Sequence, residues 1–564
     1  MKAIEYAKHI AEQLLDTLLP KRKTLAQLRE QWGKPGSKHE PFAGRWFELL
    51  HSDASCVDNK TWSDLEFPRL FVDLDTTVTP LGSQALHKQL REYVDDPVEL
   101  AARHAVHVRL RDDSALRERL QMALLPLREA SHAHVVDALY AEAPEPPTQR
   151  LLLTLWGAFS LTLLVAMIAR SLSAWCWLAL LPINAVILYR YSWRSLREIE
   201  TLNGCLHMLS AADLLCAISA DLPQLRRLRD EESARREVRS ALRFMRICKS
   251  GPAWLMPSLN IAFLPELIVH VWSMEQFYRL RQLLRPTFEL VSGIDASLAL
   301  ASTLERYPRH CQPELVATTS LEILEGSHPL LPNGTANSIE LNGRSALVTG
   351  SNMAGKTTFV KMVAINAILG RTVGFCLATR ALLPRLPVMA AIHGEHSVES
   401  GKSRYFAEIE AIRGFLDSEA NHEGGVFVLD EPFSGTNTTE RIAIACAVLR
   451  ALGERSMVLV TTHDVELQAM LGERYELYHF QEDPEVKDYF DYRLRTGAAT
   501  ERNAIRLLAR MDFPSEVVSA AMDWVTRIEA WPSRTNFVGS HTKLCAPPQR
   551  NMGPPGLEPG TNGL

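Results

Sequence analysis

The longest apolar pattern in the chain lies near its middle. The stretches Leu151–Ala169 and Ser171–Tyr189 each run for 19 residues without a charged side chain, and only Arg170 separates them. An α-helix rises about 1.5 Å per residue, so each stretch could cross a hydrocarbon core of roughly 30 Å. Arg150 and Arg190 flank the outer ends, where they would lie at bilayer interfaces. The pattern predicts a transmembrane helical hairpin with both chain termini in the cytosol. The alternative is a hairpin buried in a large water-soluble core.

Helical periodicity dominates on both sides of this hairpin. We divide this part of the chain into an N-terminal helical segment (1–66), the first half of an all-α core (67–142), a linker with the hairpin (143–195) and the second helical part of the core (196–313). The Pro-rich stretch Ala143–Gln149 supplies the linker, because proline interrupts helices.

Beyond residue 313 short apolar runs alternate with helical segments. Residues 345–350, 426–431 and 457–464 each read as a buried strand that ends in polar residues. Such strands, separated by helices, predict an α/β domain with a mostly parallel sheet over 314–530. The Pro- and Gly-rich residues 531–564 predict a disordered tail.

Length and composition narrow the possibilities. A chain of 564 residues exceeds one ordinary core, so about two to four domains are expected. The formal net charge of −5 gives no overall attraction to nucleic acid, so any such contact needs a local patch. Nine cysteines without a C-x-x-C pair indicate a reduced compartment and no structural zinc.

One candidate patch is a basic stripe, formed by Arg235, Arg239, Arg243 and Arg246 at helical spacing. The first interpretation is a solvated helix face whose charge is balanced by Asp230–Glu232. The second is contact with DNA phosphates or anionic lipid.

The clearest chemical motif is a phosphate-binding loop. Gly350, Gly355, Lys356 and Thr357 satisfy the pattern G-x-x-x-x-G-K-[ST], between a strand at Ala346–Thr349 and a predicted helix. Glycines let backbone N–H groups turn toward phosphate oxygens, and the lysine neutralises the β and γ phosphates. The threonine hydroxyl is suited to Mg²⁺. The motif predicts ATP and Mg²⁺ as cofactors.

Two further strand ends complete the pattern. The strand that ends in Asp430 is followed at once by Glu431, and a third strand ends at His463. Asp430 is suited to the metal, Glu431 to polarising the attacking water, and His463 to sensing the γ-phosphate. The alternatives are an acidic strand cap and a structural histidine. The order of the loop, the Asp-Glu pair and the histidine along the chain favours the catalytic interpretation. The predicted catalytic residues are then Glu431, His463 and Lys356.

The detailed sequence of these motifs resembles that of the MutS family of DNA mismatch-repair ATPases. The loop GSNMAGKTT (Gly350–Thr358) looks like that family's G-P-N-M-G-G-K-S-T, and Ser327–Gly350 is similar to its His-Pro lead-in. Val373–Ile409 follows the family run that ends in G-x-S-T-F-x-x-E-M. The resemblance is specific over Glu325–Ala521, and a weaker match at Leu74–Leu110 looks like the start of the family's helical core.

This resemblance implies an α/β ABC-like P-loop ATPase domain, joined to an all-α MutS-type core that carries the hydrophobic hairpin. It implies nucleotide contacts from Gly350, Ser351, Asn352, Met353, Ala354, Gly355, Lys356, Thr357, Thr358 and Ser403. Ser403 would donate to ATP bound on the other subunit, while Thr357 and Asp430 would hold Mg²⁺. A homodimer with ATP at the subunit interface, and DNA as a partner, are implied as well.

Several positions depart from the family pattern. Ser351 and Ala354 replace Pro and Gly in the loop, Arg404-Tyr405 replaces Thr-Phe, and Pro432-Phe433 alters the segment after the Asp-Glu pair. These changes leave the phosphate chemistry intact and put the subunit-signalling geometry in doubt.

The family's mismatch reader is not expected here. It wedges an aromatic ring from a Phe-x-Glu motif in a separate N-terminal domain, for which no room is expected before Leu74. The Phe-x-Glu triplet Phe406-Ala407-Glu408 falls inside the ATPase signature.

We therefore expect a MutS-like ATPase that acts on DNA as a dimeric, ATP-driven clamp, in mismatch repair or a related transaction. It is expected at the inner or cytoplasmic membrane through residues 151–189, with a cytoplasmic location as the alternative. The alternative function is a membrane-associated ABC-like ATPase with a membrane or protein partner. A scaffold that binds ATP without turnover is disfavoured by Glu431, since inactive sites commonly lose the base. An ordinary ABC transporter is disfavoured because no L-S-G-G-Q segment is present.

Overall fold

The computed structural model describes residues 25–37, 40, 42–50, 56–142, 150–169, 173, 175, 178–242, 256–351, 354–392, 404–421, 424–482, 490–498 and 513–529. The chain forms two compact units, Met1–Ala499 and Thr500–Leu564. In the second unit the described part holds helix α23 (Ser515–Glu529). The domain boundaries expected from the sequence remain predictions.

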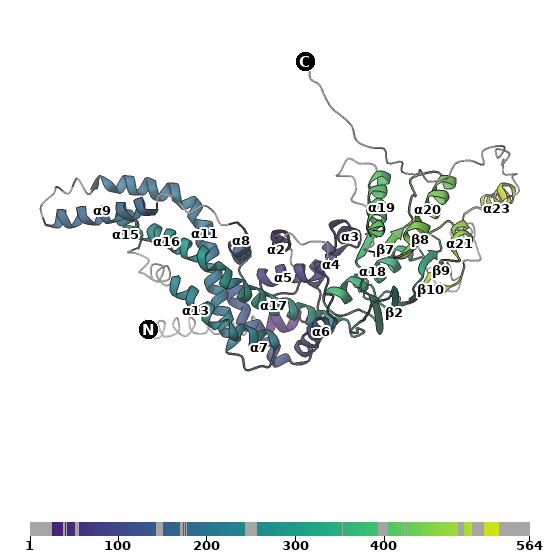
Figure 1. Ribbon diagram of the computed structural model, residues 1–564, viewed down its shortest axis with the longest axis horizontal. Coiled ribbons are helices and arrows are strands. Elements are labelled where there is room, and N and C mark those ends of the chain that lie inside the picture. Colours follow the sequence, from purple (N-terminus) through teal and green to yellow (C-terminus); the bar gives the residue numbers. More distant parts are fainter. Residues whose placement is uncertain are drawn as a thin grey trace, which may run out of the picture. The chain divides into compact units, whose positions relative to one another are not determined.

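The first unit begins with an all-helical part (Figure 1). Its helices are α2 (Arg45–Leu49), α3 (Asn59–Asp64), α4 (Phe67–Leu74), α5 (Pro80–Arg91), α6 (Pro97–Asp112), α7 (Ser114–Leu124), η1 (Leu125–Leu127), η2 (Ala130–His134), α8 (Val135–Tyr140), α9 (Arg150–Ile168), α11 (Leu180–Cys216), α12 (Pro223–Asp230), α13 (Glu232–Ala241), α15 (Met256–Phe263), α16 (Pro265–Leu280), η3 (Arg281–Leu284) and α17 (Arg285–Arg306).

Helix α17 is the centre of this part, and it is joined to α5 by a buried carboxylate. Asp295 accepts hydrogen bonds from the backbone N–H groups of Val78 and Thr79, both at 2.8 Å. The Thr79 hydroxyl accepts from Gly82 N–H and so caps α5. A Cβ at Gly82 would lie 2.2 Å from an Asp295 oxygen, so only glycine permits this approach. The sequence pattern D-x-T-x-T-x-x-G, formed by Asp75, Thr77, Thr79 and Gly82, therefore serves to join α5 to α17.

The predicted membrane hairpin is reproduced only in its first half. Helix α9 is long and apolar enough to cross a membrane by length and composition, over Leu151–Ile168, and no other described helix meets both criteria. The described end of the second stretch enters α11, a 37-residue helix whose apolar part is only Leu180–Arg190. A hairpin of two equal spans is thus not confirmed.

The basic stripe also differs from both interpretations. Arg235 is only 1% exposed and donates to the carbonyl of Leu228, and its guanidinium lies 3.9 Å from Asp213 on α11. Arg239 pairs with the same carboxylate. These two arginines tie α13 to α11 and do not form a solvated or DNA-facing surface. Arg243 and Arg246 lie outside the described residues.

The α/β part contains two sheets (Figure 1). Its strands are β1 (Glu314–Val316), β2 (Ser320–Gly326), β3 (Asn337–Asn342), β4 (Ser345–Thr349), β5 (Arg380–Pro384), β6 (Val388–Ala391), β7 (Val426–Asp430), β8 (Met457–Thr462), β9 (Tyr475–Glu482) and β10 (Phe490–Thr496). Its helices are α18 (Lys356–Thr372), α19 (Arg404–Ala420), α20 (Thr438–Leu452) and α21 (Glu466–Leu471).

The larger sheet has the strand order β10-β9-β4-β8-β7-β6, and the smaller one β1-β5-β2-β3. In the larger sheet β9, β4, β8, β7 and β6 pair in parallel, and only β10 is antiparallel. Every residue of β4, β7 and β8 is buried. The prediction of buried parallel strands at these three places is confirmed. Because parallel strands end at one edge, the residues after them meet there.

The helical part closes the free edge of the larger sheet. The Thr61 hydroxyl accepts from the N–H of Ala390 in β6, and Asp64 accepts from the N–H of Ile392, both at 2.9 Å. The Tyr93 hydroxyl accepts from the N–H of Val388 at 3.0 Å. Side chains from α3 and from the end of α5 thus take the place of a further strand beside β6.

Candidate nucleotide site

The phosphate-binding loop is shaped by two glycines with positive φ. Gly350 has φ 147°, and a Cβ there would lie 2.9 Å from the carbonyl oxygen of Phe480. Gly355 has φ 97° and directly precedes α18. Side chains other than glycine rarely adopt this backbone conformation. The loop therefore leaves β4, turns, and enters the N-terminus of α18, where unpaired N–H groups favour an anion.

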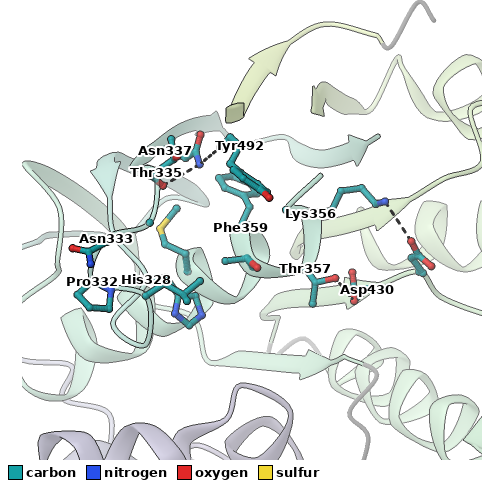
Figure 2. Close-up of a pocket in the computed structure, with 16 residues that line it drawn as sticks. His328, Pro332, Asn333, Thr335, Asn337, Lys356, Thr357, Phe359, Asp430 and Tyr492 are labelled. Carbon is teal, nitrogen blue, oxygen red and sulfur yellow. Dashed lines mark hydrogen bonds and ion pairs between the residues drawn. The ribbon is translucent and has the colours of Figure 1, made fainter. Parts of the chain in front are cut away.

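Lys356 is the first residue of α18 and its ammonium points back into the loop. Its Nζ donates to the carbonyls of Gly350 and Ser351 at 2.8 and 2.9 Å. The same atom lies 3.4 Å from an oxygen of Glu431, and the side chain is 4% exposed (Figure 2). The positive charge is thus held between the loop and the end of β7.

Thr357 and Asp430 form the second contact across the site. The Thr357 hydroxyl donates to Asp430 Oδ2 at 2.8 Å (Figure 2). The Thr461 hydroxyl donates to Asp430 Oδ1. Asp430 is 7% exposed. Oxygen ligands from hydroxyl and carboxylate groups are those that Mg²⁺ prefers. These two residues would hold a Mg²⁺ ion, which would supply positive charge next to a bound phosphate.

Glu431 stands at the end of β7 in a constrained backbone conformation. Its φ is 47°, and its N–H donates to the carbonyl and hydroxyl oxygens of Thr461 at 3.1 and 3.2 Å. The hydrogen bonds to β8 hold this uncommon conformation and direct the carboxylate toward Lys356. A carboxylate held at this place can orient a water molecule for attack.

His463 follows β8 and lies beside Glu431. Its Nδ1 is 3.6 Å from Glu431 Oε2, and its Nε2 is 3.8 Å from Asp464 Oδ1. Arg441 from α20 binds Asp464 through two hydrogen bonds of 2.8 and 2.6 Å. This hydrogen bonding raises the pKa of Arg441 and keeps Asp464 paired. Sequence reasoning missed Arg441 and Asp464, because the contact joins two separate elements.

The loop opens into a pocket of about 880 Å³ (Figure 2). Its lining residues are His328, Leu331, Pro332, Asn333, Gly334, Thr335, Asn337, Gly355, Lys356, Thr357, Thr358, Phe359, Met362, Asp430, Glu431 and Tyr492. The volume suits a drug-sized ligand or a nucleotide. Lys356, Thr357 and Asp430 lie at one end of the pocket, and the segment between β2 and β3 lies at the other.

Tyr492 and His328 are two of the pocket residues to which sequence reasoning assigned no role. Asn337 donates to the Tyr492 carbonyl at 2.9 Å, and the tyrosine ring lies against Gly355, where a Cβ would be 3.2 Å from it. Burial lowers the pKa of His328 to about 4, so its imidazole is neutral at pH 7. The pocket is thus also lined by an aromatic ring and a neutral imidazole.

Most predicted site residues meet at this one place. The pocket lining includes Gly355, Lys356, Thr357, Thr358, Asp430 and Glu431, and Gly350, Ser351, Ala354 and His463 lie in the adjoining loop and strand end. Asn352, Met353 and Ser403 lie outside the described residues, so their contacts stay predictions. Within the Phe-x-Glu triplet, Glu408 accepts a 2.6 Å hydrogen bond from the N–H of Phe433. That carboxylate therefore supports the segment after Glu431.

Comparison with known proteins agrees with this geometry. Residues 346–529 match the family model described as MutS domain V, an ATPase-type α/β domain. The chain is 31% identical to the DNA mismatch repair protein MutS of Thermus aquaticus over 253 residues, which are 44% of this chain and 31% of that protein. It is 29% identical to MutS of Chloroflexus aurantiacus over 262 residues, 44% of this chain and 27% of the relative.

A fungal relative shows the same extent of similarity. The DNA mismatch repair protein MSH3 of Phaeosphaeria nodorum is 31% identical over 260 residues, 43% of this chain and 23% of the relative. The matched region therefore spans about a third or less of each of these relatives.

Proposed function

Because the C-terminal part of this chain belongs to the MutS family, we propose that the protein binds and hydrolyses ATP and acts on DNA as a dimeric clamp. One observation carries the catalytic half of this proposal. The Thr357–Asp430 hydrogen bond and the Lys356–Glu431 ion pair lie side by side at the mouth of one pocket. These are the four groups that phosphoryl transfer to water requires.

Each group has a distinct role. Lys356 binds the β and γ phosphates, while Thr357 and Asp430 hold Mg²⁺, which would neutralise charge on the phosphate oxygens. Glu431 accepts the proton of the attacking water. His463 lies 3.6 Å from Glu431 and would report whether the γ-phosphate is present.

The dimeric part of the proposal rests on the family resemblance around Ser403. An ATP that contacts the loop of one protomer and Ser403 of another would couple ATP binding to closure and hydrolysis to release. The relatives are named DNA mismatch repair proteins, so DNA is the proposed partner, in mismatch repair or a related transaction. No Phe-x-Glu reader is assigned, and mismatch reading itself is not part of the proposal.

We further propose that α9 anchors the protein in the inner or cytoplasmic membrane, with the ATPase part in the cytosol. The 18-residue window Leu151–Ile168 has a mean hydropathy of 2.2, and only 17% of it is buried within the protein. A water-soluble core helix of this composition would be mostly covered. The same observation favours the second candidate, an ATPase whose partner is a membrane or a membrane protein and not DNA.

The ATPase rate of the purified, detergent-solubilised chain separates the two candidates. The rate is measured without addition and with homoduplex, mismatched and branched DNA, at stated salt, because phosphate contacts are salt-dependent. Stimulation by one DNA form supports the DNA clamp. Basal turnover that no DNA form changes contradicts it and favours the membrane-side partner.

A further inference from the structure

A second apolar helical segment packs against the proposed anchor. We use the name apolar bundle for α9, the first turns of α11 (Leu180–Arg190), α15 and α16 (Figure 1). Leu153 of α9 forms a cluster with Leu264, Leu267 and Val271, and Ile187 of α11 packs on it. The broken segment α15–α16 is therefore in contact with both α9 and α11.

A fully buried amide lies at the centre of this bundle. Asn184 of α11 is 0% exposed. Its Oδ1 accepts from the indole N–H of Trp156 in α9 at 2.7 Å. Its Nδ2 donates to the carbonyls of Ile261 and Ala262 at 2.9 and 3.1 Å. One side chain thus links all three elements.

The position of this amide has a physical reason. Pro265 stands four residues after Ile261 and has no N–H, so the Ile261 carbonyl cannot make its ordinary helical hydrogen bond. Leu264 between the two helices has φ 57°, which breaks the helix at that point. The amide of Asn184 supplies the missing donor. Where no water is available, a carbonyl released by proline must be satisfied in this way.

Small residues also lie where α9 contacts α15–α16, beside the cluster of leucines and valine. A Cβ at Gly157 would lie 2.6 Å from Ile268 Cδ1 and 2.9 Å from the carbonyl oxygen of Phe263. Ser160, one turn further along α9, is 0% exposed and donates to the Trp156 carbonyl. Small and hydroxyl residues at helix contacts are typical of packing within membranes.

The outer surface of the bundle carries the large apolar side chains. On α9 these are Leu151, Leu152, Leu155, Phe159, Leu161, Val165 and Ile168, with exposed fractions of 47 to 70%. On the other segments they are Ile183, Val186, Ile261 and Trp272, exposed by 42 to 65%. A water-soluble helical unit places polar side chains on its outer surface, whereas this bundle exposes large apolar side chains and encloses Asn184 and Ser160.

We propose that α15–α16 is membrane-embedded together with α9 and α11, and that Asn184 locks the three elements into one intramembrane unit. The occupant of the exposed apolar surface is lipid hydrocarbon. This inference rests on the membrane anchoring proposed above and extends it to a segment that the apolar pattern did not single out.

A photoreactive phospholipid tests the inference on the unaltered full-length chain. The protein is reconstituted in vesicles that contain a lipid with a diazirine in its acyl chain, irradiated and digested with trypsin. Cleavage after lysine and arginine gives peptides 151–170, 171–190 and 250–279, which separate α9 from α15–α16. Peptide 442–450 of α20, with the sequence IAIACAVLR, is an equally apolar control from the ATPase part.

Lipid adducts are expected in 151–170 and in 250–279, at least about tenfold above those in 442–450. Adducts in 151–170 without adducts in 250–279 would overturn the inference and leave the anchor intact. The same conclusion would follow if a second copy of the chain, and not lipid, covered the apolar surface of α15–α16. If peptides 151–170, 171–190 and 250–279 all lack lipid adducts, both the anchor and the inference are overturned. The ATPase rate of the same vesicles tests the nucleotide site independently.

Discussion

The nucleotide site and the apolar bundle place their polar groups in opposite ways. In the ATPase part β4, β7 and β8 are buried throughout, and the charged residues gather where these strands end. In the apolar bundle the polar Asn184 is enclosed among apolar side chains, and large apolar side chains are also exposed on the outer surface. The first arrangement suits a domain surrounded by water, and the second suits one surrounded by hydrocarbon. The proposed anchor therefore predicts that one chain folds in contact with two solvents, water and hydrocarbon.

The largest effect is expected at the loop. Lys356→Ala removes the charge between the loop carbonyls and Glu431. ATP turnover should fall at least about a hundredfold, the size expected when a group that stabilises developing charge is removed. The measurement is phosphate release by the solubilised chain. Lys34→Ala, at a lysine 60% exposed beside Glu30, is the control. Unchanged hydrolysis in Lys356→Ala would refute the assignment of the site.

A second change separates binding from turnover. Glu431→Gln keeps the shape of the side chain but removes the base, so hydrolysis should fall by about 10² or more while ATP stays bound. The closed dimer should then persist in ATP and appear as a doubled mass in gel filtration with light scattering. A variant that holds ATP and remains monomeric would contradict the shared site.

The same glycine substitution should act with opposite sign in the two regions. Gly157→Ala in α9 places a methyl group against Phe263 and Ile268 and should destabilise the bundle by about 1–3 kcal/mol. Gly414→Ala in α19 meets nothing within 4 Å and should stabilise its helix by about 0.5–1 kcal/mol. Thermal unfolding in detergent measures both. Equal effects would show that α9 does not pack closely on α15–α16.

The smallest effect is expected at the buried amide. Asn184→Leu removes the donor to Ile261 and Ala262 and should lower stability in a membrane mimetic by about 1 kcal/mol. Ile183→Leu, one residue away on the exposed face, is the matched control and should have no measurable effect. An Asn184→Leu variant as stable as this control would exclude the lock.

Sequence reasoning found the groups whose spacing along the chain is short or follows strand ends. Lys356 and Thr357 are adjacent, and Asp430 and Glu431 end a recognisable apolar strand, so the local pattern was sufficient. The sequence did not reveal contacts between residues on elements that are far apart along the chain. Tyr492 meets Gly355 only because β10 folds back beside β9, and Arg441 reaches Asp464 from another helix.

The helical part was harder to predict for a related reason. Pro265 interrupts the apolar run of α15–α16, and Glu266 and His270 dilute it, so no long charge-free stretch marks it. Arg235 has the spacing of a surface stripe, but its guanidinium is buried against α11. Periodicity shows which residues share a face, and packing decides what that face meets.

The closure of β6 by Thr61, Asp64 and Tyr93 has a consequence for how the protein can be divided. A fragment that begins at residue 314 would leave the N–H groups of Val388, Ala390 and Ile392 open on a flat strand. Such an edge pairs readily with a neighbouring molecule. The isolated ATPase region would therefore aggregate, whereas a chain that keeps the helical part has this edge covered. The helical segments thus prevent the larger sheet from pairing with strands of neighbouring molecules.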